Sequence, residues 1–235
     1  MGMVTPVPPF RPHAVVFDLD GVLVDSEGLW SQAESRVVES LGGAWHPDVG
    51  ERMLGLGPAD AAAVLAEHLE HPDPEEVEER LLTVALELFT AGVRPRDGAG
   101  ALLAALRGQV PVGVATNSRR ILAEASLSSA GLAGSIDALV TADEARAAKP
   151  DPAPYLLACE TLEVAPTATV VFEDSPVGAQ AARSAGCWVI GCPEEITSAL
   201  PAAHVVVADL AAIDVAVLLD GEPHRAPRAD ALGSP

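Results

Sequence analysis

Positive charge is scarce in this sequence of 235 residues. There are 34 acidic side chains against 14 basic ones, which gives a formal net charge of -20 at pH 7. A protein with that excess of negative charge repels nucleic acids and anionic membrane surfaces, so we exclude a polyanion-binding function. Thirteen of the basic residues are arginines, and Lys149 is the single lysine. Any chemistry that needs a primary amine therefore depends on this one side chain.

Aromatic residues, cysteines and long apolar runs are also rare or absent. Aromatic residues make up 3% of the chain, too few for a surface that stacks on bases. The three cysteines, Cys159, Cys187 and Cys192, lack the spacing of a zinc site and are expected to be free thiols in a reducing compartment. No apolar run approaches the ~18 residues of a membrane span, and the N-terminal segment lacks the apolar part of a secretory signal. We therefore expect a cytoplasmic monomer or weak dimer that binds neither nucleic acid nor membrane.

Short β-branched runs alternate with helical stretches rich in alanine and leucine. The predicted strands are Ala14–Phe17, Val110–Ala115, Ile136–Val140, Thr169–Phe172, Trp188–Ile190 and His204–Val207. The predicted helices are Ala99–Leu106, Arg119–Ala130, Ala153–Leu162, Pro176–Ala185 and Leu210–Leu219. This alternation is typical of a parallel sheet with helices on both faces, and it predicts a Rossmann-like, doubly wound α/β core.

The stretch 26–92 interrupts this alternation, because it contains no credible strand. Three helices are predicted in it, Leu29–Leu41, Ala59–Leu69 and Pro74–Ala91, and it carries 14 acidic residues against three arginines. We expect an inserted α-helical cap domain at 26–92, on a catalytic core formed by 13–25 and 93–220. Residues 1–12, which hold four prolines, and residues 221–235, which lack apolar periodicity, are expected to be a disordered arm and tail.

Asp18 and Asp20 follow the first predicted strand, in the sequence VVFDLDGVLVDSE. Open α/β folds bind their ligands at the carboxyl ends of the strands. Residues two apart on an extended backbone point the same way, so the two carboxylates either bind a divalent cation or divide acid and base roles. The alternative is that they only cap the turn at Gly21.

Polar residues also follow the second predicted strand and precede a helix. Thr116, Asn117 and Ser118 offer hydroxyl and amide groups there, and a helix N-terminus adds free backbone N–H groups that favour an anion. An ordinary helix cap is the alternative interpretation. Lys149 precedes a proline in an extended segment after the third strand, which indicates a need for a compact positive charge.

Glu173 and Asp174 end the next strand in the sequence VVFEDSPVGAQAA. Adjacent carboxylates that face the first acidic pair would repel it without a counter-ion. Mg2+ is the economical explanation, and a capping turn is the alternative.

The four motifs together, DLDGVLVDS, TNS, KPDP and FEDSPVGAQAARSAG, resemble those of the haloacid dehalogenase superfamily, in its phosphatase and β-phosphoglucomutase-like branch. The resemblance spans about residues 13–195, and the helical insertion has the place of that family's cap. It implies a Mg2+-dependent phosphatase that acts on a small phosphorylated metabolite, a sugar or polyol phosphate, through an aspartyl-phosphate intermediate.

The resemblance also implies a role for each motif residue. Asp18 resembles the nucleophile, and Asp20 resembles the general acid that later serves as the base. The implied Mg2+ ligands are the Asp18 carboxylate, the Asp20 main-chain carbonyl, Glu173 and Asp174, directly or through water. The implied ligands of the transferring phosphoryl group are Thr116, Asn117 and Lys149.

Comparison with the family's patterns reduces the number of reactions that this chain could catalyse. Dehalogenases of the family lack the second aspartate of the first motif, so the presence of Asp20 argues against dehalogenation. No lysine occurs in 26–92, which excludes a Schiff base from the cap. Pro58 and Trp30 stand where mutase relatives hold an arginine and a histidine, so hydrolysis is favoured over phosphoryl isomerisation. A sugar phosphomutase and a catalytically idle phosphate-binding protein remain as alternatives.

The residues of the predicted insertion do not identify the substrate. Four residues either wall a partly apolar pocket or pack the helices together: Trp30, Trp45, Met53 and Leu54. Three arginines either contact a distal group of the substrate or lie on the surface: Arg52, Arg119 and Arg120.

Overall fold

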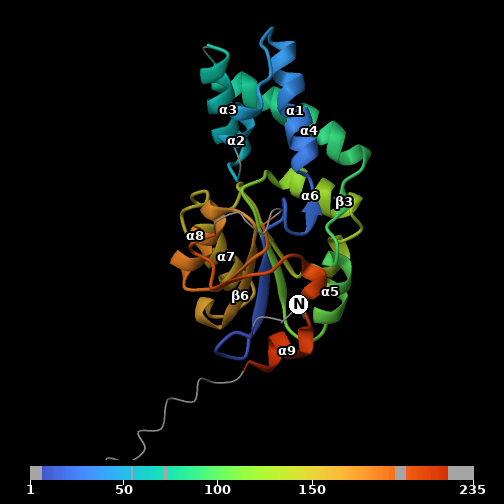
Figure 1. The fold of residues 1–235 in the computed structure, drawn as a ribbon, viewed down its shortest axis with the longest axis vertical. Helices are drawn as coiled ribbons and strands as arrows, with labels where there is room; N and C mark the ends of the chain where they lie inside the picture. Colours follow the sequence, from blue (N-terminus) through green and yellow to red (C-terminus); the bar gives the residue numbers. More distant parts are fainter. Residues whose placement is uncertain (1–6, 54, 71–72, 194–199, 222–235) are drawn as a thin grey trace, which may run out of the picture.

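The fold is described from a computed structural model, in which residues 7–53, 55–70, 73–193 and 200–221 are placed. Figure 1 shows a layered α/β unit with a group of helices above the carboxyl ends of its strands. Leu54, one of the expected pocket residues, lies outside the described residues.

A six-stranded sheet forms the centre of the α/β unit, and every neighbouring pair of its strands is parallel. The strands are β1 Ala14–Phe17, β4 Val112–Ala115, β5 Ala138–Val140, β6 Thr169–Glu173, β7 Trp188–Gly191 and β8 Val205–Val206. Their order is β5-β4-β1-β6-β7-β8. The chain moves outward from β1 in both directions, so the switch point that binds ligands in such sheets lies beside β1. This arrangement confirms the predicted doubly wound core.

Helices cover both faces of the sheet (Figure 1). They are α5 Ala99–Leu106, α6 Arg120–Ser129, α7 Ala153–Thr161 and α8 Pro176–Ala185. Val16 and Val171 belong to a buried apolar cluster with α7 and α8, whereas Phe17 and Phe172 face the cluster that contains α5 and α6. The rings of Phe17 and Phe172 stack with their centroids 4.9 Å apart. Alternate residues of each strand are thus buried on opposite faces, as a covered parallel sheet requires.

The predicted helix Leu210–Leu219 is wrong as a single element. The structure has a 3-10 helix at Leu210–Ala212 and then a separate helix, α9, at Val215–Asp220. The Asp214 side chain accepts hydrogen bonds from the backbone N–H groups of Ala216 and Val217. An aspartate with free backbone donors after it starts a helix rather than continuing one, which explains the break.

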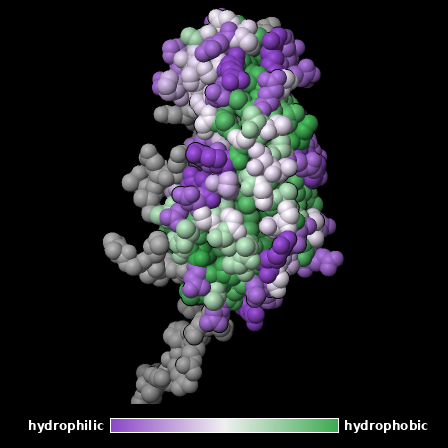
Figure 2. Space-filling model, turned by 90° about the vertical axis from the view of Figure 1, so that its right-hand side faces the viewer, coloured by the Kyte–Doolittle hydropathy of each residue, from purple (hydrophilic) through white to green (hydrophobic). Residues whose placement is uncertain are grey.

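Four helices form the group above the sheet: α1 Glu27–Ser40, α2 Pro47–Glu51, α3 Pro58–His68 and α4 Pro74–Ala91. The sequence predicted three, and it treated the segment around Pro47 as a break. Pro47 instead occupies the first position of α2, where a proline costs no hydrogen bond. Hydrophilic side chains gather over this end of the molecule in Figure 2, in agreement with its acidic composition.

The two connections between this helical group and the sheet lie side by side. The short strands β2, Val24–Asp25, and β3, Arg94–Pro95, pair in antiparallel register. Arg94 also donates to the Asp25 carboxylate over 2.6 Å. The chain therefore enters and leaves the helical group through one small ribbon. This pairing was not predictable from the sequence, because two-residue strands carry no hydrophobic pattern.

Part of the predicted N-terminal arm is placed. Residues 7–12 have no regular secondary structure, yet Pro8 and Pro12 are buried and Phe10 packs against the apolar core. Residues 1–6 and 222–235 of the predicted arm and tail lie outside the described residues. Within the placed part of the chain, the helices are too short or too polar to cross a membrane. The division into cap and core at 26–92 stays a prediction.

Candidate active site

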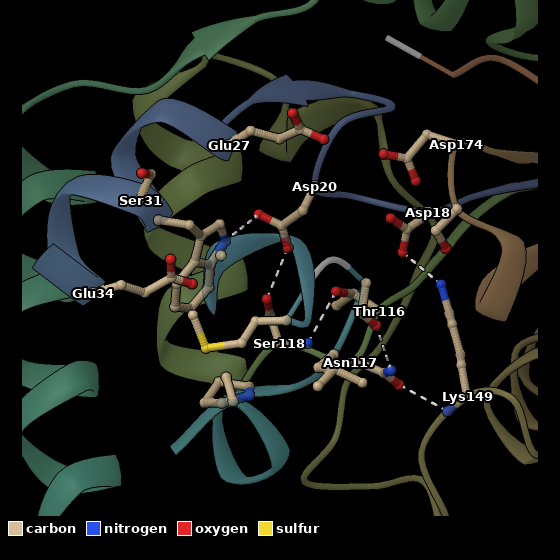
Figure 3. A pocket seen from close by; sticks show the side chains of 18 of the residues that line it. Asp18, Asp20, Glu27, Ser31, Glu34, Thr116, Asn117, Ser118, Lys149 and Asp174 are labelled. Carbon is tan, nitrogen blue, oxygen red and sulfur yellow. Dashed lines mark hydrogen bonds and ion pairs between the residues drawn. The ribbon is translucent and has the colours of Figure 1, made fainter. Parts of the chain in front are cut away.

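A cavity of about 400 Å3 lies between the carboxyl edge of the sheet and the helical group. Its core wall consists of Asp18, Asp20, Thr116, Asn117, Ser118, Lys149, Asp174 and Ser175. The other wall, called the cap wall below, comes from α1, α2, α3 and the segment between α2 and α3 (Figure 3). Six of the seven predicted site residues line the cavity, and the seventh, Glu173, is buried directly beneath it. The four sequence motifs therefore meet at one place.

Lys149 forms two ion pairs beneath the cavity. Its Nζ lies 2.5 Å from Asp18 Oδ1 and 2.7 Å from Glu173 Oε1, and all three side chains are almost completely buried. Burial alone lowers the pKa of Lys149, but the two carboxylates raise it above its usual value. Burial raises the pKa of Asp18 to about 7, against the opposing pull of Lys149. The single lysine is thus a fixed positive charge beside the first acid.

Glu173 is held by more partners than the sequence indicated. Its Oε1 also accepts from the Tyr155 hydroxyl at 2.7 Å, and its Oε2 accepts from the backbone N–H and the hydroxyl of Ser175, each at 3.1 Å. A Cβ at Gly178 would lie 1.7 Å from Glu173 Oε1, so α8 approaches this carboxylate only because position 178 has no side chain. These three supporting residues were missed. The only sequence signal for these residues was their position. Tyr155 follows the KPDP motif, and Ser175 and Gly178 follow Glu173 and Asp174.

Asp20 points away from the Asp18 and Lys149 pair in Figure 3. Its Oδ1 accepts from the Ser26 hydroxyl at 2.6 Å and from the Trp30 indole N–H at 3.1 Å, and its Oδ2 accepts from the Ser118 hydroxyl at 2.7 Å. The three donors come from the ribbon end, the cap wall and the core wall. Asp20 is therefore the residue at which these three parts of the protein are hydrogen-bonded together.

Asn117 links the lysine segment to the opposite wall. Its Oδ1 accepts from the backbone N–H of Lys149 at 2.9 Å, and its Nδ2 donates to the Gly55 carbonyl at 3.3 Å. Thr116 Oγ1 accepts from the backbone N–H of Ser118 at 3.0 Å. The predicted use of a free helix N-terminus is only partly met, because Asp143 accepts from the backbone N–H of Arg120, the first residue of α6, at 2.7 Å. The carboxylate of Asp143 thus occupies one of the backbone donors at that end of the helix that the sequence interpretation left for a ligand anion.

Three carboxylates at or directly beneath the core wall fit a divalent cation. Asp18, Glu173 and Asp174 each offer an oxygen, and these atoms lie within 4.8 Å of one another. Burial raises the pKa of Asp174 well above its usual value, and the charges of Glu173 and Asp18 raise it further. Crowded, buried oxygen ligands of this kind suit the hard cation Mg2+. The Asp20 side chain is not part of this group, and the use of its main-chain carbonyl as a ligand stays a prediction.

The expected arginine contacts are not at the cavity. Arg52 pairs with Glu67 at 2.5 Å, and Arg119 pairs with Glu78 at 2.7 Å. Arg120 likewise bonds to carboxylates of its own neighbourhood. Among the described residues, Lys149 is the only cationic side chain that lines the cavity. The surface alternative is therefore correct for these arginines.

The apolar residues expected in the insertion do reach the cavity. Trp30, Trp45 and Met53 line it, so the pocket interpretation holds for these three. Trp30 also packs its ring edge-on against Phe89 of α4, with centroids 5.2 Å apart. A single side chain thus serves both of the roles that the sequence left open.

Fold and cavity together are typical of an α/β enzyme, with a candidate active site at the strand ends beneath a helical cover. A family model described as haloacid dehalogenase-like hydrolase matches residues 12–186. The chain therefore belongs to the haloacid dehalogenase-like hydrolases, which confirms the resemblance drawn from the four motifs.

Relatives of known kind support the same branch of the family. The chain is 35% identical over 176 residues to a phosphorylated carbohydrates phosphatase of Thermotoga maritima. The aligned residues cover 74% of this chain and 82% of that protein. It is 36% identical over 198 residues to the validoxylamine A 7'-phosphate phosphatase of Streptomyces hygroscopicus subsp. limoneus, covering 83% and 92% of the two chains. The crystal structure of a putative β-phosphoglucomutase from Thermotoga maritima matches with a TM-score of 0.70 and 32% identity, over 87% of this chain and 98% of that one.

Proposed function

We propose that this protein is a Mg2+-dependent phosphatase that hydrolyses a small phosphorylated metabolite, a sugar or polyol phosphate, through an aspartyl-phosphate intermediate. One observation carries the proposal: the cavity holds two aspartates in different states of bonding. Asp18 is paired with the buried Lys149, whereas Asp20 stands apart and is bound by neutral donors. Two carboxylates in different environments can divide nucleophile and acid roles.

The first step transfers the phosphoryl group to the protein. A carboxylate oxygen of Asp18 attacks phosphorus, and the bond between phosphorus and the ester oxygen breaks. Asp20, in its protonated form, donates its proton to that departing oxygen, so the product leaves as an alcohol. Lys149 neutralises the phosphoryl oxygens, and Thr116 and Asn117 bind them.

The second step releases phosphate. Asp20, now a carboxylate, takes a proton from a water molecule that attacks phosphorus. The bond between Asp18 and phosphorus breaks, inorganic phosphate leaves, and both aspartates return to their starting states. Water is the only reactant that these two steps need besides the phosphate ester.

Asp18, Glu173 and Asp174 are the side chains proposed to hold Mg2+. The cation supplies positive charge that offsets the repulsion between a carboxylate nucleophile and an anionic phosphate ester. The raised pKa of Asp18, about 7, marks a place where such a positive charge is needed to keep the nucleophile ionised.

A sugar phosphomutase is the enzymatic alternative. It must retain a second phosphate, yet the cap wall contributes no cation to the cavity among the described residues. Trp30, in the position of the mutase histidine, donates to Asp20 rather than offering a group that titrates. These two observations favour hydrolysis.

The test is a screen of phosphorylated metabolites for release of inorganic phosphate, with and without Mg2+. We expect release from sugar or polyol monophosphates that requires Mg2+ and disappears in Asp18→Asn. Isomerised sugar phosphate without free phosphate would establish the mutase instead. No Mg2+-dependent turnover, with no difference between wild type and the variant, would indicate a catalytically idle phosphate-binding protein. A cytoplasmic location and a monomeric or weakly dimeric state stay predictions.

A further inference from the structure

Glu34 is a charged residue of the cavity that the proposed chemistry does not use. It lies on α1, one turn beyond Trp30, and only 8% of its surface is exposed. It lines the cavity, and within the described part of the chain no hydrogen bond or ion pair reaches it. A buried carboxylate normally has partners, because leaving it without them is costly.

The position of Glu34 follows from the helix that carries it. Glu27, Trp30, Ser31 and Glu34 occupy positions i, i+3, i+4 and i+7 of α1, and all four line the cavity. These positions share one helix face. The neighbouring face of the same helix, with Ala33, Val37 and Val38, is buried in the apolar core. Glu34 is therefore on the wall of the cavity rather than between packed helices.

The two sides of the cavity carry different charged groups. The core side has Lys149 together with three aspartates, whereas the charged described residues of the cap side are the acids Glu27 and Glu34. Lys149 lies on the core side and is the only cation among the described lining residues. Glu34 lies across the pocket from it in Figure 3, on the cap side. Burial disfavours the ionised form of Glu34 and raises its pKa to about 7, and a hydroxyl group that enters and donates to the carboxylate would offset this cost.

We infer that Glu34 is the specificity residue for the alcohol part of the substrate, accepting hydrogen bonds from its hydroxyl groups and rejecting a second anionic group. The favoured substrates are then monophosphates whose alcohol part is uncharged and rich in hydroxyl groups, such as hexitol phosphates. Bisphosphates and phosphorylated acids are disfavoured, because their second charge would lie against Glu34 in a cavity wall without a cation. The inference rests on the proposed function and narrows its substrate class.

The test compares the ratio of kcat/KM for a hexitol 6-phosphate to that for p-nitrophenyl phosphate, which has no hydroxyl groups. Glu34→Leu removes both charge and hydrogen bonding at similar size, and we expect this ratio to fall about tenfold or more, mainly through KM. Glu34→Gln keeps the shape and some hydrogen bonding, so its ratio should fall less. The same Gln variant should improve the use of fructose 1,6-bisphosphate relative to the hexitol phosphate.

Glu39→Leu is the matched control, because Glu39 lies on the same helix and is exposed. Its ratio should equal that of the wild type. An unchanged ratio in both Glu34 variants, or an equal loss on both substrates, would overturn the inference while leaving the phosphatase in place. If the wild type released phosphate from none of these esters, the proposed function itself would be wrong, and this inference with it.

Discussion

The two walls of the cavity treat their charged groups differently. On the core side, Lys149 lies between two carboxylates, and Glu173 has a partner for each of its oxygens. On the cap side, the buried Glu34 has no partner among the residues that the structure describes. Groups held from several directions are fixed before the substrate arrives, as catalysis of a common step requires. A group without a partner in the protein is free to bind the ligand, which is what selection among substrates requires. The comparison separates residues expected to act on every substrate from those expected to distinguish them.

The largest expected effect is at the core wall. Asp18→Asn keeps the size of the side chain but removes the nucleophile, and we expect kcat to fall by at least about 10^4-fold on every substrate. A steady-state assay of phosphate release measures it. Glu39→Gln, a change of the same kind on the exposed face of α1, is the control. A fall on only some substrates would contradict the assignment of this wall to the common chemistry.

The second effect concerns the acid that joins the two walls. Asp20→Asn removes proton transfer, and we expect kcat to fall by about 10^2-fold to 10^4-fold. Arg52→Ala, which removes a cap cation that is exposed and paired with Glu67, should change turnover far less. Rates measured side by side decide between them, and comparable losses in the two variants would argue against the acid and base role of Asp20.

The third effect is on stability, and its sign follows from the pKa of Glu34. Burial raises that pKa from 4.5 to about 7, so the folded state binds the proton more tightly than the unfolded state does. The contribution of Glu34 is most favourable below pH 4.5 and is lost as the pH rises towards 7. Glu34→Gln does not titrate. We expect it to become more stable than the wild type above pH 7, by about 3 kcal/mol.

Urea unfolding of the two proteins at several pH values checks this prediction. The difference between them should be small near pH 4 and reach its full size near pH 8. The other buried acids are common to both proteins and cancel in the difference. A difference that did not vary with pH would mean that Glu34 is not buried as an unpartnered carboxyl group.

The smallest effect is expected at Trp30. Trp30→Phe keeps an aromatic ring for the contact with Phe89 but removes the N–H donor to Asp20. One of three donors is lost, so we expect kcat to fall by about tenfold or less. The basic limb of the pH profile of kcat is the second readout, because a purely structural role of the ring would not move it. An unchanged profile with unchanged kcat would remove Trp30 from the support of Asp20.

Local patterns were sufficient to predict the sheet and the meeting of the four motifs. The strands of the core are short apolar runs, and their polar ends are forced together because parallel strands end at one edge. The residues around Glu173 were not predictable in this way. Tyr155 and Gly178 act through contacts with a residue distant in sequence or in an adjoining element, and such contacts leave no periodic pattern. The break before α9 was missed because the capping side chain of Asp214 outweighs the helical propensity around it.

The ribbon formed by β2 and β3 has a consequence for how this architecture varies. Asp25 and Arg94 are paired neighbours, although more than sixty residues of chain separate them in the sequence. The sheet therefore constrains where the helical insertion begins and ends, but not its length or its content. Wall residues such as Glu34 belong to a module whose replacement leaves the strand register untouched, so a new substrate preference can be acquired without rebuilding the chemistry below it.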